Sequence, residues 1–231
     1  MSARPPRSTR VVALVAARDE GDRIADTVRG IRALAEVSEV VVVDDGSRDG
    51  TASVALGAGA AVIRSERSLG KGRALEGALR RLPAADVWLL ADGDLAAAAG
   101  ELGSVLAPVL AGEADVAIGV FPPDHGGGFG LVKRAAARAI ATLTGYRARE
   151  PLSGQRALTG MAMEAVRPLA AGFGVETAMT IDAVRAGFRV VEVPAALSHR
   201  PTYRDLRGFV HRGRQGLDIA LAVLPRALAL R

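Results

Sequence analysis

Trp88-Leu-Leu-Ala-Asp-Gly-Asp-Leu95 has the pattern of a buried strand that ends in two aspartates one residue apart. Gly93 allows a tight turn between Asp92 and Asp94, which would place two carboxylates at the carboxyl edge of a sheet. Carboxylate oxygens are preferred by Mg²⁺ and Mn²⁺, and such ions commonly bridge protein carboxylates to substrate phosphates. Asp and Gly are also common in ordinary turns. The stretch by itself therefore indicates either a metal clamp for a diphosphate or a plain strand-end turn.

Around this stretch, short apolar runs alternate with helical patterns. We predict strands over residues 11–16, 40–43, 61–63, 87–90 and 116–120, with helices over 22–35, 51–56, 71–82 and 101–111. Short, wholly apolar strands separated by helices are typical of a parallel sheet covered on both faces. Such sheets bind ligands beyond the carboxyl ends of their strands. The predicted fold class is therefore α/β, with a mostly parallel sheet and helices on both faces.

The pattern changes after Val120. A glycine-rich loop over 122–130 precedes a helix over 131–143, a loop around 151–156, a helix over 175–186 and a strand over 188–193. An amphipathic helical segment over 203–230 follows, with an interruption expected near Pro225 because proline removes a helix hydrogen bond. We therefore divide one domain into a flexible N-terminus (1–9), a first half (10–120) and a smaller C-terminal half (121–231).

The composition limits the classes of function. The chain has 231 residues and no cysteine, which excludes disulfides, thiolate metal sites and a cysteine nucleophile. Its net charge of +5 suits phosphate-bearing partners. Residues 1–10 do not resemble a secretory signal, and no stretch reaches the roughly 18–20 apolar residues of a membrane-spanning helix. We therefore expect a cytoplasmic protein.

Polar residues follow each strand of the first half. They form the segments Ala16–Glu20, Asp44–Thr51, Gly70–Gly72 and Asp92–Asp94, which would converge in one crevice. Helix capping could explain some of them singly, with Asp49 or Ser47 before the helix at 51 and Asp19 or Asp22 before the helix at 22. Capping does not explain why two aspartates follow a run of valines at 44 and 45.

Two of these segments together resemble the nucleotide-sugar-binding half of GT-A-fold glycosyltransferases of the family 2 type. They are Val40-Val-Val-Val-Asp-Asp-Gly-Ser-Arg-Asp-Gly-Thr51 and Asp92-Gly-Asp94. The resemblance implies a Rossmann-like GT-A fold, with 10–120 as the nucleotide-sugar-binding half and 121–231 as the acceptor half. It also implies transfer of a sugar from a UDP- or GDP-linked donor with Mg²⁺ or Mn²⁺. The positions it assigns to the nucleotide are Ala16, Glu20, Asp45 (to the base) and Lys71, and those it assigns to the metal are Asp92 and Asp94, the latter also catalytic. Arg18-Asp19 departs from the usual opening Ala-x-Asn-Glu.

The second half narrows the resemblance. Three motifs there resemble those of glucosyl-3-phosphoglycerate synthases and soluble polyprenol-phosphate sugar transferases. They are Pro151-Leu-Ser-Gly-Gln-Arg-Ala157, Gly172-Phe-Gly-Val-Glu176 and Ser198-His-Arg200. This implies a small phosphorylated or polyprenyl-phosphate acceptor. It places Gln155 and Arg156 at the sugar or diphosphate, Glu176 at the sugar and acceptor as a catalytic group, and His199 as a further metal ligand. Glu176 could instead be a carboxylate that favours a helix start, and His199 a surface histidine.

Two departures weaken the acceptor side of the resemblance. The glycine loop Gly126–Gly130 lacks the Arg and Thr that hold phosphoglycerate in the synthases, and no asparagine follows His199-Arg200. The arginines after residue 198 would bind an acceptor phosphate or an anionic lipid surface, or form a solvated helix face. Peripheral contact with the inner face of the membrane and a homodimer therefore stay open.

Two other classes of protein remain as alternatives. A sugar-nucleotide nucleotidylyltransferase would need a glycine-rich loop directly after the first strand, and Ala16–Glu20 has none. A non-catalytic basic module for polyanions or membranes would interleave basic with aromatic residues. Aromatic residues make up only 3% of the chain, so we expect no nucleic-acid partner.

Overall fold

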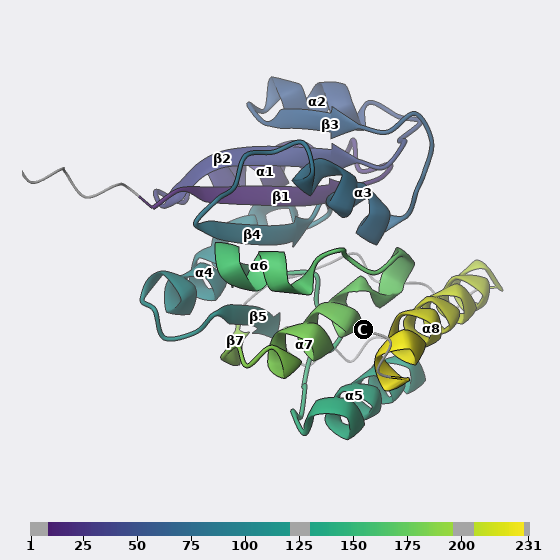
Figure 1. Cartoon of the computed structure of the whole chain (residues 1–231). Coiled ribbons are helices and arrows are strands. Elements are labelled where there is room, and N and C mark those ends of the chain that lie inside the picture. The colour runs from purple at the N-terminus through teal and green to yellow at the C-terminus, as the bar shows by residue number, and fades with distance from the viewer. Residues whose placement is uncertain (1–8, 121–129, 196–205, 229–231) are drawn as a thin grey trace, which may run out of the picture.

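The computed structural model describes residues 9–120, 130–195 and 206–228, with side chains in the last segment from residue 216 onward. Within these ranges the chain forms a seven-stranded sheet in the order β3-β2-β1-β4-β6-β5-β7 (Figure 1). Only β6 runs antiparallel to its neighbours, β4 and β5. The strands are β1 Val11–Ala17, β2 Val37–Asp44, β3 Ala61–Arg64, β4 Val87–Asp92, β5 Val116–Val120, β6 Arg156–Thr159 and β7 Val190–Pro194. The prediction of a mostly parallel sheet is confirmed.

Helices cover both faces of this sheet because the strands are apolar on both faces. In β1, for example, Val11, Ala13 and Val15 pack into one core cluster and Val12 and Leu14 into the other. The first cluster is closed by α1 Ile24–Arg32, α2 Thr51–Gly57, the 3-10 helix η1 Ala96–Glu101 and α4 Leu102–Leu110. The second is closed by α3 Lys71–Leu79, α6 Gly160–Val166 and α7 Val175–Arg185.

The remaining elements lie in the second half of the chain. They are α5 Leu131–Thr144, the 3-10 helix η2 Gly172–Gly174 and α8 Leu206–Ala227. Helix α8 packs against α5, α7 and η2 and lies beside the sheet, at the edge of the molecule in Figure 1. None of the helices in the described ranges is long and apolar enough to cross a membrane.

The structure differs from the sequence-based prediction at two places in the second half. Strand β6 and helix α6 were not predicted, because four residues that begin with a charged arginine directly after a loop give too short a pattern. The interruption expected at Pro225 is also absent, since α8 continues through it. Pro225 lies in the last turn of α8, and the hydrogen bond that it cannot donate is the one to the carbonyl of Leu221, an exposed residue. Residues 1–8, 121–129 and 196–205 lie outside the described residues, and with them nearly all of the predicted N-terminal tail (1–9) and glycine loop (122–130).

Candidate active site at the carboxyl edge of the sheet

The register of the three central strands brings the predicted polar segments to one edge. Ala17 on β1 pairs with Asp44 on β2, and the half-buried Ala16 pairs with Asp92 on β4. Gly93 N–H donates to the carbonyl of Ala16 at 2.9 Å, so the turn after β4 rests directly on the end of β1. The convergence of these segments, expected from the sequence, is therefore present in the fold.

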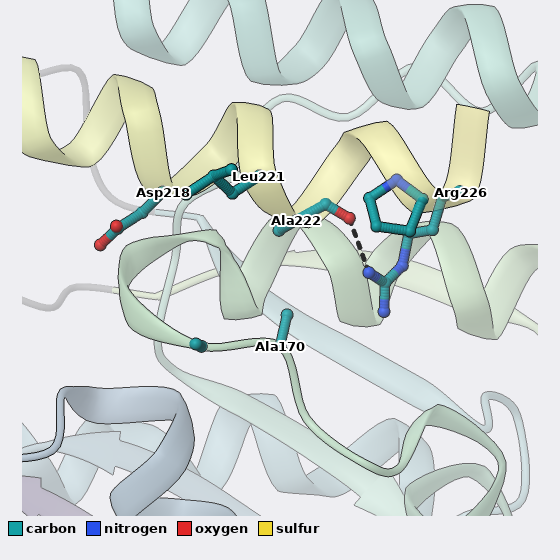
Figure 2. Close-up of a pocket in the computed structure, with 7 residues that line it drawn as sticks. Ala170, Asp218, Leu221, Ala222 and Arg226 are labelled. Carbon is teal, nitrogen blue, oxygen red and sulfur yellow. Dashed lines mark hydrogen bonds between the residues drawn. The ribbon is translucent and has the colours of Figure 1, made fainter. Parts of the chain in front are cut away.

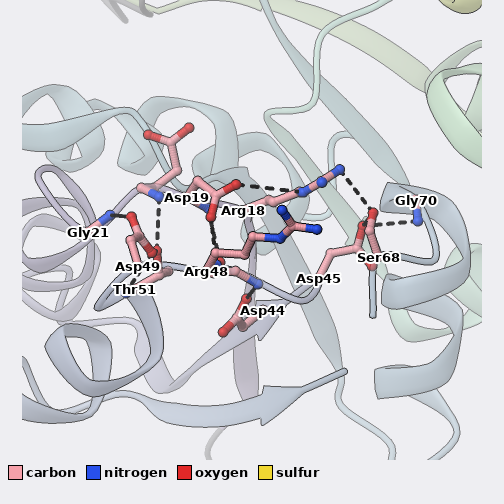
Figure 3. Close-up of polar contacts among 12 residues, drawn as sticks. Arg18, Asp19, Gly21, Asp44, Asp45, Arg48, Asp49, Thr51, Ser68 and Gly70 are labelled. Carbon is pink, nitrogen blue, oxygen red and sulfur yellow. Dashed lines mark hydrogen bonds and ion pairs between the residues drawn. The ribbon is translucent and has the colours of Figure 1, made fainter. Parts of the chain in front are cut away.

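Asp45 binds the loop that leads to Lys71. One carboxylate oxygen accepts hydrogen bonds from the Ser68 hydroxyl at 2.8 Å and from Gly70 N–H at 2.9 Å, and the other accepts from Leu69 N–H at 2.6 Å (Figure 3). A carboxylate has about four acceptor positions, so three are used within the protein. The carboxylate that was assigned to the base thus also shapes the loop beside it, and the described residues leave one acceptor position on Oδ1 unused.

Asp44 has a different role from its neighbour. It is fully buried, accepts a hydrogen bond from Ser47 N–H at 2.8 Å, and lies 3.4 Å from Arg64 Nε. It therefore stabilises the turn around Gly46, whose positive φ of 73° favours glycine. A Cβ on Gly46 would also come within 2.7 Å of the Arg67 backbone. The run of valines ends in an aspartate because this turn needs a buried acceptor.

The loops after β1 and β2 are held to each other by further hydrogen bonds (Figure 3). The Asp19 carboxylate accepts from Arg48 N–H at 2.8 Å, and the Asp49 carboxylate accepts from Gly21 N–H at 3.0 Å. The Thr51 hydroxyl donates to Asp49 and is the main reason that the pKa of Asp49 lies below its usual value. Neither Asp19 nor Asp22 caps α1, which begins without a side-chain cap.

The predicted nucleotide contact Glu20 lies at the end of this braced loop. Its side chain is half-buried, and its N–H donates to the Thr51 hydroxyl at 2.9 Å. The backbone of Glu20 is therefore fixed by a residue of α2, next to the end of β1.

Lys71 lies between two carboxylates from opposite halves of the chain. Its ammonium is 2.5 Å from Asp92 Oδ1 and 2.7 Å from Glu176 Oε1, and Gln155 Nε2 donates to Asp92 Oδ2 at 3.0 Å. Burial alone would lower the pKa of Lys71, but the attraction of Asp92 and then Glu176 outweighs it and raises the pKa above its usual value. The site therefore contains a permanent cation between two acids.

Gly154 makes this cluster sterically feasible. A Cβ at residue 154 would overlap Lys71 Nζ and would lie 2.6 Å from Asp92 Oδ2. The glycine of the Ser-Gly-Gln-Arg motif thus lets β6 approach β4 and Lys71 closely, a function that the sequence reasoning missed although it quoted the motif.

The Asp92-Gly93-Asp94 turn is tethered to α1. The Thr27 hydroxyl donates to the Gly93 carbonyl at 2.9 Å, and Arg23 Nη1 donates to the Asp94 carbonyl at 3.2 Å. A Cβ on Gly93 would lie 2.9 Å from Ala17 Cβ, while its φ is not among the positive values. The predicted turn at Gly93 is present, and the glycine is needed there because it packs closely against β1.

The donor set fits a divalent cation in part. Asp92 and Asp94 are both half-buried, and Mg²⁺ or Mn²⁺ is commonly held by one or two carboxylates together with substrate phosphates. Among the described residues no group of three or more His, Asp or Glu could hold a metal by itself. The predicted third ligand, His199, lies outside the described residues.

Arg156 connects the loop before β6 to α7. It is fully buried, with Nε donating to the Ser153 carbonyl at 2.8 Å and Nη1 to the Thr180 hydroxyl of α7 at 2.9 Å. Burial lowers its pKa to about 10, so it stays charged near neutral pH. Its side chain lies between β6 and α7, and it therefore supports α7. The predicted contact of Arg156 with the sugar or diphosphate stays a prediction.

Comparison with known proteins places the chain in a family. Residues 13–162, which include all the segments described above up to Arg156, match the family model described as Glycosyl transferase family 2. The chain belongs to this family. It is therefore a glycosyltransferase, and the alternatives of a nucleotidylyltransferase and of a non-catalytic binding module are set aside.

Individual relatives agree with this assignment. The chain is 31% identical to Glycosyltransferase AglJ of Haloferax volcanii over 204 residues, which are 87% of this chain and 67% of that protein. Its fold is similar to glucosyl-3-phosphoglycerate synthase from Mycobacterium tuberculosis in complex with Mg²⁺ and UDP, with a TM-score of 0.80 and 26% identity over 94% of this chain and 79% of the other. A second structure of that synthase, with Mn²⁺, UDP-glucose and glycerol 3-phosphate, gives a TM-score of 0.76 at 25% identity and covers 94% and 80%. The fold is thus GT-A-like, as predicted.

Proposed function

We propose that the protein transfers a sugar from a nucleoside-diphosphate sugar, UDP- or GDP-linked, to a small phosphorylated or polyprenyl-phosphate acceptor. The observation that carries this proposal is the cluster of Lys71 between Asp92 and Glu176. It joins the donor side of the sheet to the acceptor half at the edge where ligands of parallel sheets bind. The structures of the related synthase contain UDP or UDP-glucose, which favours a uridine donor here.

The donor would lie along the ends of β1, β2 and β4. We assign the nucleoside to Ala16, Glu20 and the remaining acceptor position of Asp45, and the diphosphate to the neighbourhood of Asp92 and Asp94. These two carboxylates, with His199 as a further candidate, would hold Mg²⁺ or Mn²⁺. When bound there, the ion neutralises charge on the departing diphosphate.

The residues of the chain provide the remaining electrostatics. The Lys71 ammonium offsets the charge of Asp92, so a metal and a diphosphate can share the edge without a large excess of either sign. Gln155, which donates to Asp92, fixes that carboxylate and lies next to the proposed sugar position. The chain thus presents a preorganised set of charges to the bond that breaks.

Glu176 is the proposed catalytic group on the acceptor side. Its side chain is largely buried at the first turn of α7, where the helix dipole and Lys71 both favour a carboxylate. With a hydroxyl acceptor, its oxygen would accept the hydroxyl proton as the new bond forms. A phosphate acceptor is already ionised and needs no such step, so Glu176 would then stabilise positive charge on the sugar.

The surface of α8 supports an acceptor presented by a membrane. Ile219 and Ala222 are buried against the domain, while the opposite face exposes leucines at helical spacing. These are Leu217, Leu221, Leu224 and Leu228, each between 55% and 60% exposed. An amphipathic helix of this kind, in a chain of net charge +5, suits peripheral contact with an anionic lipid surface on the cytoplasmic side.

The test is calorimetric titration of the protein with UDP, GDP and ADP, each with Mn²⁺ and with EDTA. We expect one nucleotide to bind only with metal, which would identify the base and reduce the problem to an acceptor screen. Phosphoglycerate, glycerol 3-phosphate and a short polyprenyl phosphate would be compared in that screen. Absence of binding to all three nucleotides would refute the proposed donor site.

A further inference from the structure

The 3-10 turn η2, which precedes Glu176, is held in place by the C-terminal helix α8. Helix α7 begins at Val175, directly after the 3-10 turn η2 Gly172–Gly174. Asp218, on α8, accepts a hydrogen bond from Phe173 N–H at 3.0 Å, although the two residues lie far apart in the sequence. A residue of α8 thus fixes the backbone two peptides before α7 begins.

Two glycines permit this contact. Gly172 has a φ of +63°, and a Cβ there would overlap the Asp218 carboxylate. A Cβ on Gly174 would lie 2.5 Å from both Ala222 Cβ and the Asp218 carbonyl oxygen. The Gly172-Phe-Gly174 motif, which the sequence marked only as part of a family resemblance, is therefore explained by the close approach of α8.

The opposite side of the same segment touches the start of α3. A Cβ on Gly72 would overlap the Ala170 carbonyl oxygen, and a Cβ on Gly70 would lie 3.6 Å from Gly172 Cα. Lys71, between these two glycines, makes its 2.7 Å ion pair with Glu176. Segment 170–174 is thus clamped between α8 and the residues that flank Lys71.

The space between the segment and α8 is only partly filled. A cavity of about 230 Å³ lies there, lined by Ala170, Asp218, Leu221, Ala222 and Arg226 among others (Figure 2). Among the described residues, the close contacts of the turn with α8 are therefore confined to Asp218 and Ala222, beside this cavity. The position of the turn then depends strongly on the Asp218–Phe173 hydrogen bond and on the glycine contacts.

We infer that Asp218 is a positioning residue: through the Phe173 amide it sets the start of α7, and thereby holds Glu176 against Lys71 at the active site. This inference rests on the proposed role of Glu176. Displacement of a catalytic group by about 1 Å can cost roughly 100-fold in rate, so a single hydrogen bond at this point has a measurable effect on transfer.

A second polar contact of α8 provides a matched control. Arg226 Nε donates to Asp182 Oδ1 of α7 at 2.8 Å, and Arg185 donates to the Arg226 carbonyl at 2.8 Å. The ion pair of Arg226 with Asp182 therefore also holds α8 against α7, but neither of its hydrogen bonds involves a residue of η2. Asp182→Asn therefore weakens helix docking without removing the hydrogen bond to Phe173.

The experiment compares Asp218→Ala, Asp218→Asn and Asp182→Asn in the full-length protein. Hydrogen–deuterium exchange of the peptide covering 172–177 is measured first. Turnover follows, with UDP-glucose, Mn²⁺ and 3-phosphoglycerate as the probe reaction, and UDP affinity is measured by calorimetry. For Asp218→Ala we expect exchange at least fivefold faster, kcat about tenfold lower and UDP affinity within twofold of wild type. Asp218→Asn keeps an acceptor oxygen and should recover most of both losses.

Either of two results would overturn the inference. One is unchanged exchange and kcat in Asp218→Ala. The other is an equal loss in Asp182→Asn, which would mean that general docking of α8 matters and not the contact with Phe173. If wild-type protein binds none of UDP, GDP and ADP in the presence of metal, the proposed function fails, while the exchange measurement still decides whether Asp218 fixes the turn.

Discussion

Replacement of Lys71 by methionine tests the centre of the proposed site. The substitution keeps much of the side-chain length but removes the ammonium that lies 2.5 Å from Asp92 and 2.7 Å from Glu176. Two carboxylates would then face each other without the cation between them. We expect the variant to fold, because Lys71 lies at the first residue of α3 and the sheet core does not depend on it.

The structure sets the size of the effect. The side chain of Asp92 is 35% exposed, so water screens part of its loss, whereas that of Glu176 is only 8% exposed. Removal of one partner from a buried pair costs about 3–5 kcal/mol. That figure refers to folding stability. We expect the transition state to lose a similar amount at the lower end, and a loss of about 3 kcal/mol there corresponds to a decrease in kcat/KM of roughly 100-fold.

The assay measures sugar transfer and unfolding temperature for Lys71→Met and for Lys133→Met. Lys133 forms a comparable 2.5 Å ion pair with Glu150, but its side chain is 44% exposed and lies outside the Lys71 cluster. We expect Lys133→Met to change activity by less than threefold, in keeping with the small worth of exposed pairs. If folded Lys71→Met retained kcat/KM within threefold of wild type, the electrostatic role of the cluster would be refuted.

Three further predictions concern the metal, the acid range and the lipid surface. Asp94→Asn should abolish metal-dependent transfer with the unfolding temperature unchanged, and full turnover in the variant would exclude the metal assignment. Thr51→Val should raise the pKa of Asp49 toward its usual value. The lowered pKa stabilises the fold above about pH 4, and this contribution is lost as pH falls further. The stability deficit of the variant should therefore shrink in acid, which NMR titration and thermal unfolding would measure. A deficit that is independent of pH would contradict this. The double variant Leu221→Ser, Leu224→Ser should sediment with anionic vesicles at least fivefold less than the wild type. Equal vesicle binding of the variant and the wild type would point away from a lipid contact. A change only from dimer to monomer in light scattering would do the same.

The sequence alone was sufficient for the fold class and for the edge of the sheet at which the predicted donor residues lie. Apolar strands such as 40–43 and 87–90 report burial on both faces, and polar residues at their ends must meet where parallel strands end together. Asp45, Lys71, Asp92 and Asp94 could be selected in this way because each belongs to a local pattern of strand, turn and helix start. The same local logic placed Glu176 at the first turn of a helix.

Only the tertiary structure decided which of these residues meet and what holds them. The contact of Lys71 with Glu176, the approach of β6 past Gly154 and the hydrogen bond from Phe173 to Asp218 join segments far apart in the chain. Such contacts leave no periodic signal, because each depends on one side chain reaching across a packed interface. Arg156 shows the same limit, since the loop motif predicted a residue near the sugar or diphosphate, while only packing revealed its burial against α7. Strand hydrophobicity therefore determined the edge at which the site lies, while packing between distant elements determined its internal geometry.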